Sequence, residues 1–262
     1  MKYLKKNFLE IKKIKLLIIV RLSSKRLKKK ALLKINNLTL IEILILRLSK
    51  FFNSKNIIIC TARNQNNKIL KKISKQHNVN FFAGAEKNIF KRIIDCQKKF
   101  NFKHFVRITG DNPLTDPQSI MELSQKHIKN KNDFTFTKSL AAGMKPEIIS
   151  FKALKKANTL AVDENSSEYL TYFFVRASFK FEEVILKKYF KNENLNSITI
   201  DTFKDFKKLK KLLKTNIFLS RKSIIQKIKK QKIKIQISKK RVPVVTKKYD
   251  VRLKNSDQTI LL

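Results

Sequence analysis

Glycine is scarce in this chain, with three in 262 residues where average usage of about 7% predicts roughly 18. Tryptophan is absent and there are four prolines. No stretch rich in glycine, serine or proline separates one part of the chain from another, so nothing marks a flexible linker. We therefore expect one domain over residues 1–262: a basic leader at 1–13, a core at 14–215, and a C-terminal helix, strand and basic tail at 216–262.

Long apolar runs are also missing. None reaches the roughly 18 residues that a membrane-spanning helix needs. The basic stretch at the N-terminus has no apolar core followed by a small-residue cleavage site, which argues against a signal peptide. The two cysteines, Cys60 and Cys96, form no C-x-x-C motif and are expected to be reduced, buried thiols. These absences predict a soluble cytoplasmic protein.

Acidic residues are few: 19 Asp and Glu stand against 61 Lys and Arg, a formal charge of +42. Three explanations fit. Lys, Asn, Ile and Phe share A/T-rich codons, so a biased base composition accounts for lysines that are spread through every segment. Binding to nucleic acid or an anionic surface is the second explanation, and attraction of an anionic substrate is the third. The even spread, and the lack of an aromatic–basic stacking platform, count against a nucleic-acid partner.

Short β-branched runs alternate with amphipathic stretches, which predicts an α/β fold with a mostly parallel central sheet and helices on both faces. Strands are expected at 14–20, 56–60, 79–82, 103–109, 133–137, 147–150, 197–200 and 233–237. Helices are expected from a capping box at Thr39 and Glu42 to about Lys50, from Pro117 with Asp116 as its cap, and at 68–77, 87–100, 151–157, 167–175, 203–214 and 220–230.

The first candidate site is the loop V-R-L-S-S-K-R-L-K-K-K, at 20–30 after the first expected strand. In open α/β sheets, ligands bind outside the carboxyl ends of the strands. The loop's cations and hydroxyls can donate charge-assisted hydrogen bonds to a triphosphate. These residues are Arg21, Ser23, Ser24, Arg26 and Lys30. In a lysine-rich protein a basic loop is more often simply solvated, so taken alone this motif is weak.

The second candidate is R-I-T-G-D-N-P-L-T-D-P, at 107–117. Gly110 permits a tight turn, and Asp111 leaves the end of a strand toward the crevice. A carboxylate there suits Mg²⁺, which prefers oxygen ligands and accepts substrate phosphates for the rest of its shell. The alternative is an aspartate that only caps a turn.

The third candidate is I-T-I-D-T-F-K-D, at 198–205. Asp201 follows an expected strand directly, while Thr202 and Asp205 predict the start of a helix. Asp201 is either a second metal ligand or a residue at the helix entry. The three glycines, Gly84, Gly110 and Gly143, are expected where a positive φ or a close backbone approach admits no other residue.

In this order, the motifs resemble the cytidylyltransferases of the spore coat polysaccharide biosynthesis protein F type, relatives of the CMP-sialic acid and CMP-Kdo synthetases. The resemblance covers about 14–213. The loop at 107–117 is the most specific match. It is joined by the basic loop after the first strand, by F-F-A-G-A-E-K-N-I-F-K-R ending at Arg92, by G-M-K-P-E around Gly143, by S-E-Y-L-T-Y-F-F at 167–174, and by the Asp201 segment.

The resemblance implies a Rossmann-like nucleotidyltransferase fold, CTP as substrate and Mg²⁺ held by Asp111 and Asp201. It implies an acceptor that is a sugar or a nonulosonate-like sugar acid, in surface polysaccharide synthesis, and a homodimer. Catalysis is expected of Arg21, Lys30 and Asp111. Nucleotide binding is expected of Arg21, Ser23, Ser24, Arg26, Lys30, Arg107 and Gly110. Acceptor binding is expected of Gly143, Glu147, Glu168 and Tyr172.

The chain also departs from the family pattern. Lys28 and Lys29 replace the usual Pro-Gly before Lys30, so we expect the loop to lose a stiff, tight corner. Tyr169 stands where histidine is common and Lys145 where aspartate often stands. Three alternatives follow: use of another nucleoside triphosphate, an inactive relative, and a basic nucleic-acid-binding protein without catalysis. No arrangement of His, Cys or Ser suggests nucleophilic catalysis.

Overall fold

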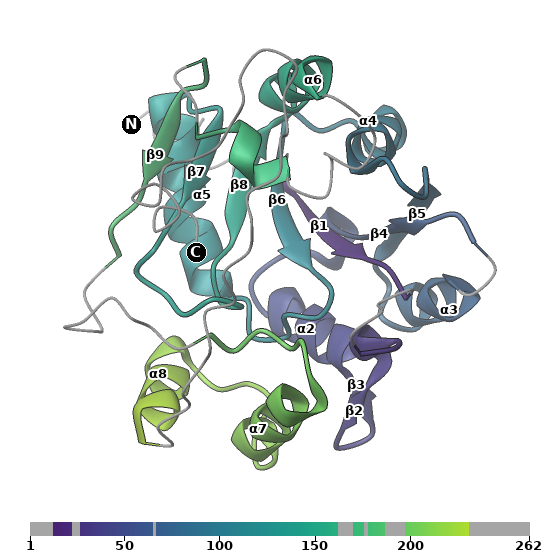
Figure 1. The fold of residues 1–262 in the computed structure, drawn as a ribbon, viewed down its shortest axis with the longest axis vertical. Helices are drawn as coiled ribbons and strands as arrows, with labels where there is room; N and C mark the ends of the chain where they lie inside the picture. The colour runs from purple at the N-terminus through teal and green to yellow at the C-terminus, as the bar shows by residue number, and fades with distance from the viewer. Residues whose placement is uncertain are drawn as a thin grey trace.

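The computed structural model describes residues 13–22, 27–64, 67–161, 170–175, 178–186 and 197–230. A seven-stranded sheet runs through these residues, with helices packed on both of its faces (Figure 1). The strands occur in the order β5 (Asn80–Gly84), β4 (Ile57–Ala62), β1 (Lys15–Val20), β6 (His104–Thr109), β8 (Glu147–Ser150), β7 (Phe134–Phe136) and β9 (Phe181–Glu183).

The sheet is mostly parallel, as predicted. β5, β4, β1 and β6 run parallel, β8 is antiparallel to both of its neighbours, and β9 is parallel to β7. The register aligns the carboxyl ends of the central strands: Val20 lies opposite Thr61, and Ile19 opposite Thr109. The loops that follow these strands therefore leave the sheet at one edge.

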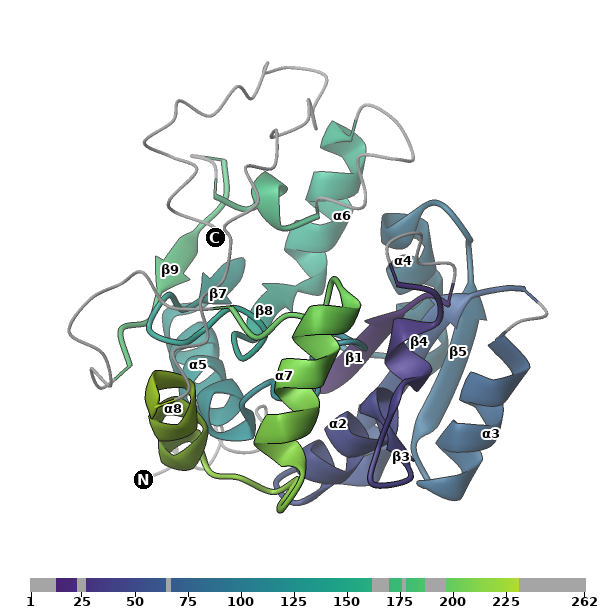
Figure 2. The ribbon, with the colours of Figure 1, turned by 60° about the horizontal axis from the view of Figure 1, so that its bottom comes forward.

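Alternate residues of β1 face two separate cores. Leu16 and Ile18 pack in a core with α2 (Leu40–Ser49), α3 (Lys68–Gln76), α5 (Pro117–Asn130), α7 (Phe203–Leu213) and α8 (Arg221–Lys230). Leu17 packs in the other core with α4 (Ile89–Phe100) and α6 (Phe151–Leu160). Figure 2 shows α7 and α8 on the same side of the sheet as α2 and α5.

The helix starts follow the predicted local signals. Thr39 and Glu42 form a capping box at α2, and Thr202 and Asp205 form another at α7. Asp116 caps α5 by accepting a hydrogen bond from the Ser119 amide, with Pro117 in the first turn. In the described part of the chain, no helix is long and apolar enough to cross a bilayer.

Several elements differ from the predictions. Residues 197–200 form no strand: the Ile198 amide bonds to Ala142 O and the Thr199 amide to Ser197 Oγ, so neither amide donates to a strand ladder. The described part of the expected helix at 167–175 is a 3₁₀ turn at 170–173. The expected strand at 233–237 lies outside the described residues. The prediction missed β9 and a hairpin of β2 (Lys34–Ile35) and β3 (Leu38–Thr39), whose turn puts Asn36 and Asn37 at positive φ.

Two glycines occupy the kinds of position expected for them. A Cβ on Gly110 would lie 2.7 Å from Val20 Cβ, so any side chain there would push β1 away from the end of β6. Gly143 has φ +90°, and a Cβ there would lie 3.0 Å from the Thr199 amide nitrogen. Both positions keep neighbouring loops in close contact.

Candidate active site

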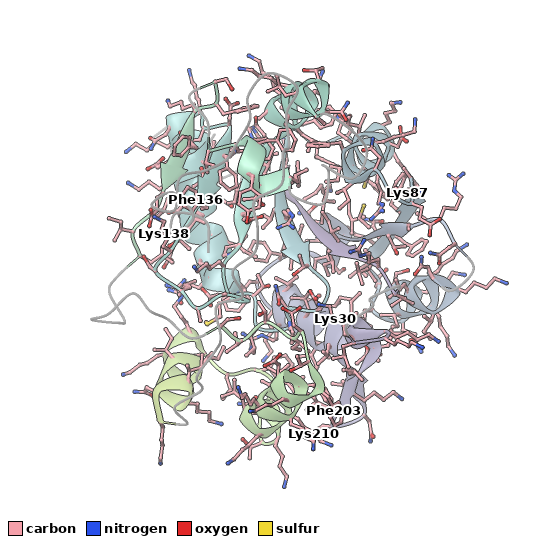
Figure 3. The ribbon with its side chains drawn as sticks, viewed as in Figure 1. Lys30, Lys87, Phe136, Lys138, Phe203 and Lys210 are labelled. Carbon is pink, nitrogen blue, oxygen red and sulfur yellow. The ribbon has the colours of Figure 1, made fainter. Side chains whose placement is uncertain are left out.

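Lys30 joins three segments that are far apart in the sequence. Its ammonium contacts the carboxylate of Asp111, lies 3.4 Å from Asp201 Oδ1, and donates a 3.0 Å hydrogen bond to Ile200 O. Lys30 follows β1, Asp111 follows β6 and Asp201 precedes α7. In Figure 3, Lys30 lies between the sheet and α7. The two aspartates that the sequence singled out thus meet at one ammonium, at the carboxyl edge of the sheet.

The sheet places Asp111 beside the loop after β1. The Gly110 amide donates a 3.0 Å hydrogen bond to Ile19 O, which continues the pairing of β6 with β1 by one more residue. The Asn112 amide then bonds back to Thr109 O, which turns the chain. Asp111 therefore stands at the corner where the strand ends.

Asp201 is set by the start of α7. The Asp201 amide lies 3.3 Å from Asp205 Oδ2, the same carboxylate that closes the capping box with Thr202. Asp201 borders the helix entry, which was one of the two alternatives for it, and it also contacts Lys30.

The loop before Lys30 keeps a tight corner, contrary to the expectation from its missing Pro-Gly. Lys29 adopts φ 50° and ψ 33°, the left-handed conformation, at the start of a 3₁₀ turn over Lys30–Leu32. This conformation costs a non-glycine residue about 1–2 kcal/mol. The corner is thus present in this chain, at a local cost in stability that glycine would avoid.

The charges of this trio do not balance. Two carboxylates face one ammonium, and the side chains of Lys30 and Asp111 are 17% and 19% exposed, which limits screening by water. In the described residues, no three His, Cys, Asp or Glu side chains gather that could hold a metal alone. Two carboxylates suit Mg²⁺, which commonly takes one or two together with substrate phosphates and water.

A second polar cluster lies where β6 pairs with β8. Arg107 stands opposite Glu147 in the ladder, and its guanidinium lies 2.6 Å from Glu147 Oε2. Thr171 donates to the same carboxylate at 3.1 Å. Lys145 is near it as well: burial lowers the pKa of Lys145, and the charges of Glu183 and Glu147 oppose that shift while Lys138 adds to it. Arg107, expected at the nucleotide, is engaged with a residue expected at the acceptor.

The structure describes only some of the other predicted site residues. Ser23, Ser24, Arg26 and Glu168 lie outside the described residues. Tyr172 is half-buried against the core of α4 and α6. Arg21 follows β1 and carries its charge near the buried guanidinium of Arg92.

Arg92 shapes the loop after β5. Its guanidinium donates hydrogen bonds to Ala85 O at 2.7 Å and to Glu86 O at 2.6 Å. Burial, more than the nearby charges, lowers the pKa of Arg92. The resemblance singled out this arginine without giving it a role, and the structure places it as a support for a loop at the carboxyl edge.

Sequence reasoning missed a charge cluster behind the Asp111 loop, in which the buried Arg47 and Arg221 and the partly exposed Glu122 gather around Asp116, expected only as a helix cap. Arg47 stands inside the apolar run L-I-E-I-L-I-L-R-L of α2, and an arginine on a core-facing stripe is the one local signal that pointed to it. Nothing local pointed to Arg221.

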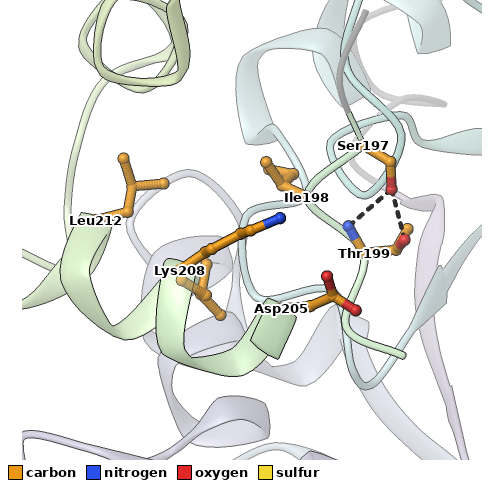
Figure 4. A pocket seen from close by; sticks show the side chains of 7 residues that line it. Ser197, Ile198, Thr199, Asp205, Lys208 and Leu212 are labelled. Carbon is orange, nitrogen blue, oxygen red and sulfur yellow. Dashed lines mark hydrogen bonds between the residues drawn. The ribbon is translucent and has the colours of Figure 1, made fainter. Parts of the chain in front are cut away.

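Two hollows lie outside the Lys30 cluster. One, lined by Ser197, Thr199, Asp205 and Lys208 among others, holds about 10 Å³, room for one water (Figure 4). The other holds about 540 Å³ beside His104 and Lys103, at the opposite end of β6 from Asp111. Neither is lined by the two aspartates.

Comparison with known proteins identifies a family. The profile of the cytidylyltransferase family matches residues 16–230. The uncharacterized protein MJ1063 of Methanocaldococcus jannaschii is 35% identical over 193 residues, covering 73% of this chain and 79% of the relative. The spore coat polysaccharide biosynthesis protein SpsF of Bacillus subtilis is 24% identical over 203 residues, covering 75% and 84%. The structure of a cytidylyltransferase from Leptospira borgpetersenii aligns with a TM-score of 0.78 at 25% identity, covering 86% and 98%.

Proposed function

This chain belongs to the cytidylyltransferase family, and we propose that it transfers the cytidylyl group of CTP to a hydroxyl of a sugar or sugar acid, releasing pyrophosphate. The family makes it a CTP-dependent nucleotidyltransferase; the acceptor and the residue roles are the proposal. The observation that supports it is the contact of Lys30 with both Asp111 and Asp201, which brings two carboxylates and a cation together at the carboxyl edge of the sheet, where open α/β sheets bind ligands.

In the proposed reaction, the acceptor hydroxyl oxygen forms a bond to the α-phosphorus of CTP as the bond from that phosphorus to the β-phosphate oxygen breaks. The hydroxyl proton passes to solvent and pyrophosphate leaves. Such a transfer depends on positioning and charge neutralisation, without a covalent intermediate on the enzyme. The chain's part is to align the two substrates and to offset charge on the leaving group.

Asp111 and Asp201 would hold Mg²⁺, whose chemistry here is Lewis-acid polarisation of the phosphate. Lys30 and Arg21 would offset the charge of the β- and γ-phosphates. Ser23, Ser24 and Arg26 are proposed for the same phosphates, and Gly110 for close approach of the backbone. The proposal needs the Lys30 ammonium to change partners, because the carboxylates that it contacts are the ones that would hold the cation.

The acceptor would lie beside Arg107 and Glu147. Glu147 can accept a hydrogen bond from an acceptor hydroxyl while Arg107 and Thr171 hold its carboxylate in place. Gly143, Glu168 and Tyr172 are proposed for the same region. Cytoplasmic location is supported by two buried free thiols, Cys60 and Cys96. A homodimer is proposed from the resemblance alone, and light scattering of the purified protein tests it.

Pyrophosphate release tests the function. The protein is incubated with Mg²⁺ and each of CTP, UTP, GTP and ATP, together with sialic-, legionaminic- and pseudaminic-type acids, Kdo and neutral sugars. We expect release with CTP to exceed that with the other nucleotides by at least about tenfold for one acidic sugar. Pyrophosphate release with another nucleotide in place of CTP would reject the proposal in favour of a different nucleotide donor. No release with any acceptor, together with salt-dependent binding of nucleic acid, would favour a nucleic-acid-binding protein.

Glu147→Gln tests the acceptor region. We expect a higher KM for the acceptor with an unchanged KM for CTP, because the change removes an acceptor contact and leaves the Lys30 cluster intact. Glu182→Gln is a matched control, since Glu182 lies on β9 and accepts hydrogen bonds from Asn130 and Asn132, neither of which is a proposed site residue. Equal effects on both KM values would place Glu147 outside the acceptor site.

A further inference from the structure

A buried ion pair lies behind the loop that carries Asp111. Arg221, the first residue of α8, directs Nε to Asp116 Oδ2 at 2.7 Å and Nη2 to the same oxygen at 2.6 Å. Both side chains are 3% exposed. Glu122 Oε2 accepts a 2.9 Å hydrogen bond from Nη2 of the same guanidinium. Burial opposes the charge of Arg221, but the bonds to Glu122 and Asp116 outweigh it and raise the pKa of Arg221.

A second buried arginine holds the segment before α8. Arg47 of α2 donates to Ile217 O at 2.8 Å and to Leu219 O at 3.1 Å, in the connection between α7 and α8. Burial lowers the pKa of Arg47 to about 10, and the negative charge of Asp116 opposes that shift. The carboxylate of Asp116 thus lies in the field of two guanidinium groups, from α2 and α8.

Asp116 connects this cluster to the site. It ends the loop that starts at Gly110, its carboxylate caps α5, and its amide bonds to Met144 O at 3.0 Å. The turn before Met144 in turn holds Ile198 through Ala142 O at 2.8 Å. The Asp111 loop and the segment leading to Asp201 are therefore tied to one another behind the carboxylates, through Asp116.

The segment between α7 and α8 is also connected to both aspartates. Asp201 directly precedes α7, and the other end of α7 leads into the residues that Arg47 holds. Arg221 then fixes the start of α8 on Asp116. The family profile extends to residue 230 and so includes α8. Residues 216–230 thus contact the segments that lead to both aspartates, through Arg47 and Arg221.

We propose that Arg221 is a positioning residue: through Asp116 it fixes the Asp111 loop and α7, and so sets the placement of Asp111 relative to Asp201. The proposal rests on the proposed function for the roles of the two aspartates. Its physical basis is geometric. A planar guanidinium that bonds two carboxylates at once allows one orientation, whereas a lysine ammonium is a point charge on a flexible stem.

The test compares Arg221→Lys and Arg221→Gln with Lys222→Gln, which removes an exposed positive charge from the next residue of α8. Three quantities are measured: the unfolding temperature, kcat and KM for CTP, and the Mn²⁺ concentration that half-saturates the protein in the presence of CTP, by water-proton relaxation. Assays are run well below the unfolding temperature of each variant, so that only folded protein is compared.

We expect Arg221→Gln to lower the unfolding temperature by about 10 °C and kcat by about 10²-fold, and to weaken Mn²⁺ binding at least about fivefold. Arg221→Lys keeps the buried charge, so it should recover most of the unfolding temperature while kcat and Mn²⁺ binding stay impaired. Lys222→Gln should match the wild type in all three quantities. The separation of stability from turnover in Arg221→Lys is the result that a merely structural role would not produce.

The proposal is overturned if folded Arg221→Lys has kcat and Mn²⁺ half-saturation within twofold of the wild type. If Arg221→Gln does not fold, Arg221→Lys decides the question. Failure of the proposed function gives a different result, because the wild type itself then shows no turnover of CTP. In that case the Mn²⁺ titration is repeated without nucleotide, and it still reports whether Arg221 controls the placement of Asp111 relative to Asp201.

Discussion

The ammonium of Lys30 and the carboxylate of Asp111 form an ion pair between the loop after β1 and the loop after β6. The same ammonium lies 3.4 Å from Asp201 Oδ1. One lysine thus takes the position between two carboxylates that a divalent cation would share with them.

Asp111→Asn should lower kcat by at least about 10²-fold, because it removes a charge from a partly water-excluded electrostatic site. Asp201→Asn should act in the same direction. The measurement is steady-state pyrophosphate release at saturating CTP. Asp95→Asn, on the exposed side of α4 and paired with Lys98, serves as the control and should retain full activity. Activity of Asp111→Asn within a few-fold of the wild type would reject its metal role.

Lys30→Met should separate turnover from metal binding. Without the ammonium, a cation no longer competes with Lys30 for Asp111 and Asp201, so Mn²⁺ should bind the nucleotide-free protein at least about threefold more tightly. Turnover of CTP should nevertheless fall by about 10²-fold or more, since the phosphates lose a cation. Calorimetric titration with Mn²⁺ and the release assay measure the two effects. Lys28→Met, at an exposed position of the same loop, should change neither; weaker Mn²⁺ binding in Lys30→Met would contradict the idea.

Lys29→Gly should stabilise the protein by about 0.5–1 kcal/mol. Lys29 pays for a left-handed backbone at φ 50° that glycine adopts freely, although glycine also gains entropy in the unfolded chain. The gain corresponds to about 1–4 °C in unfolding temperature. Lys28→Gly has the same entropic effect without a positive φ to relieve, so it should be neutral or destabilising. Equal shifts in the two variants would mean that the corner is unstrained.

Stability should fall as the pH drops through the range of histidine titration, because of His127. Its ring is fully buried between His104 and Thr135. Burial, helped by the charge of His104, lowers the pKa of His127 to about 3. The pKa of this histidine in the unfolded chain is about 6.5. At a pH between the folded and the unfolded pKa, the unfolded chain binds a proton at His127 and the folded protein does not, so acidification favours unfolding.

The expected slope from this group is about 1 kcal/mol per pH unit between pH 6 and 5. Urea unfolding at several pH values measures it. His127→Gln should lower stability at pH 7 yet flatten the slope, while Lys129→Gln, on the exposed side of the same helix, should keep the wild-type slope. A slope in His127→Gln equal to that of the wild type would show that other groups control the acid limb.

Several strands and helix starts of this fold could be predicted from short segments of the sequence. The buried run of β1, the capping boxes at Thr39 and Thr202, and the Asp116–Pro117 start of α5 each depend on residues within about four positions. Such signals act through the backbone nearby, and the structure keeps them. The segment at 197–200 also has a strand-like composition, yet it forms no strand, because its Ile198 amide bonds to a loop carbonyl, Ala142 O, and its Thr199 amide to Ser197 Oγ.

The sequence by itself determined the alternation of strands and helices, the caps, and two aspartates that each follow an apolar run. Tertiary structure alone decided that Lys30 meets Asp201, 171 positions away, and that Arg221 meets Asp116, 105 positions away. The physical reason is that a cap or a turn is stabilised within a few residues. A contact between distant charges exists only when the parallel sheet and its helices have brought their loops to one edge, and no local pattern carries that information.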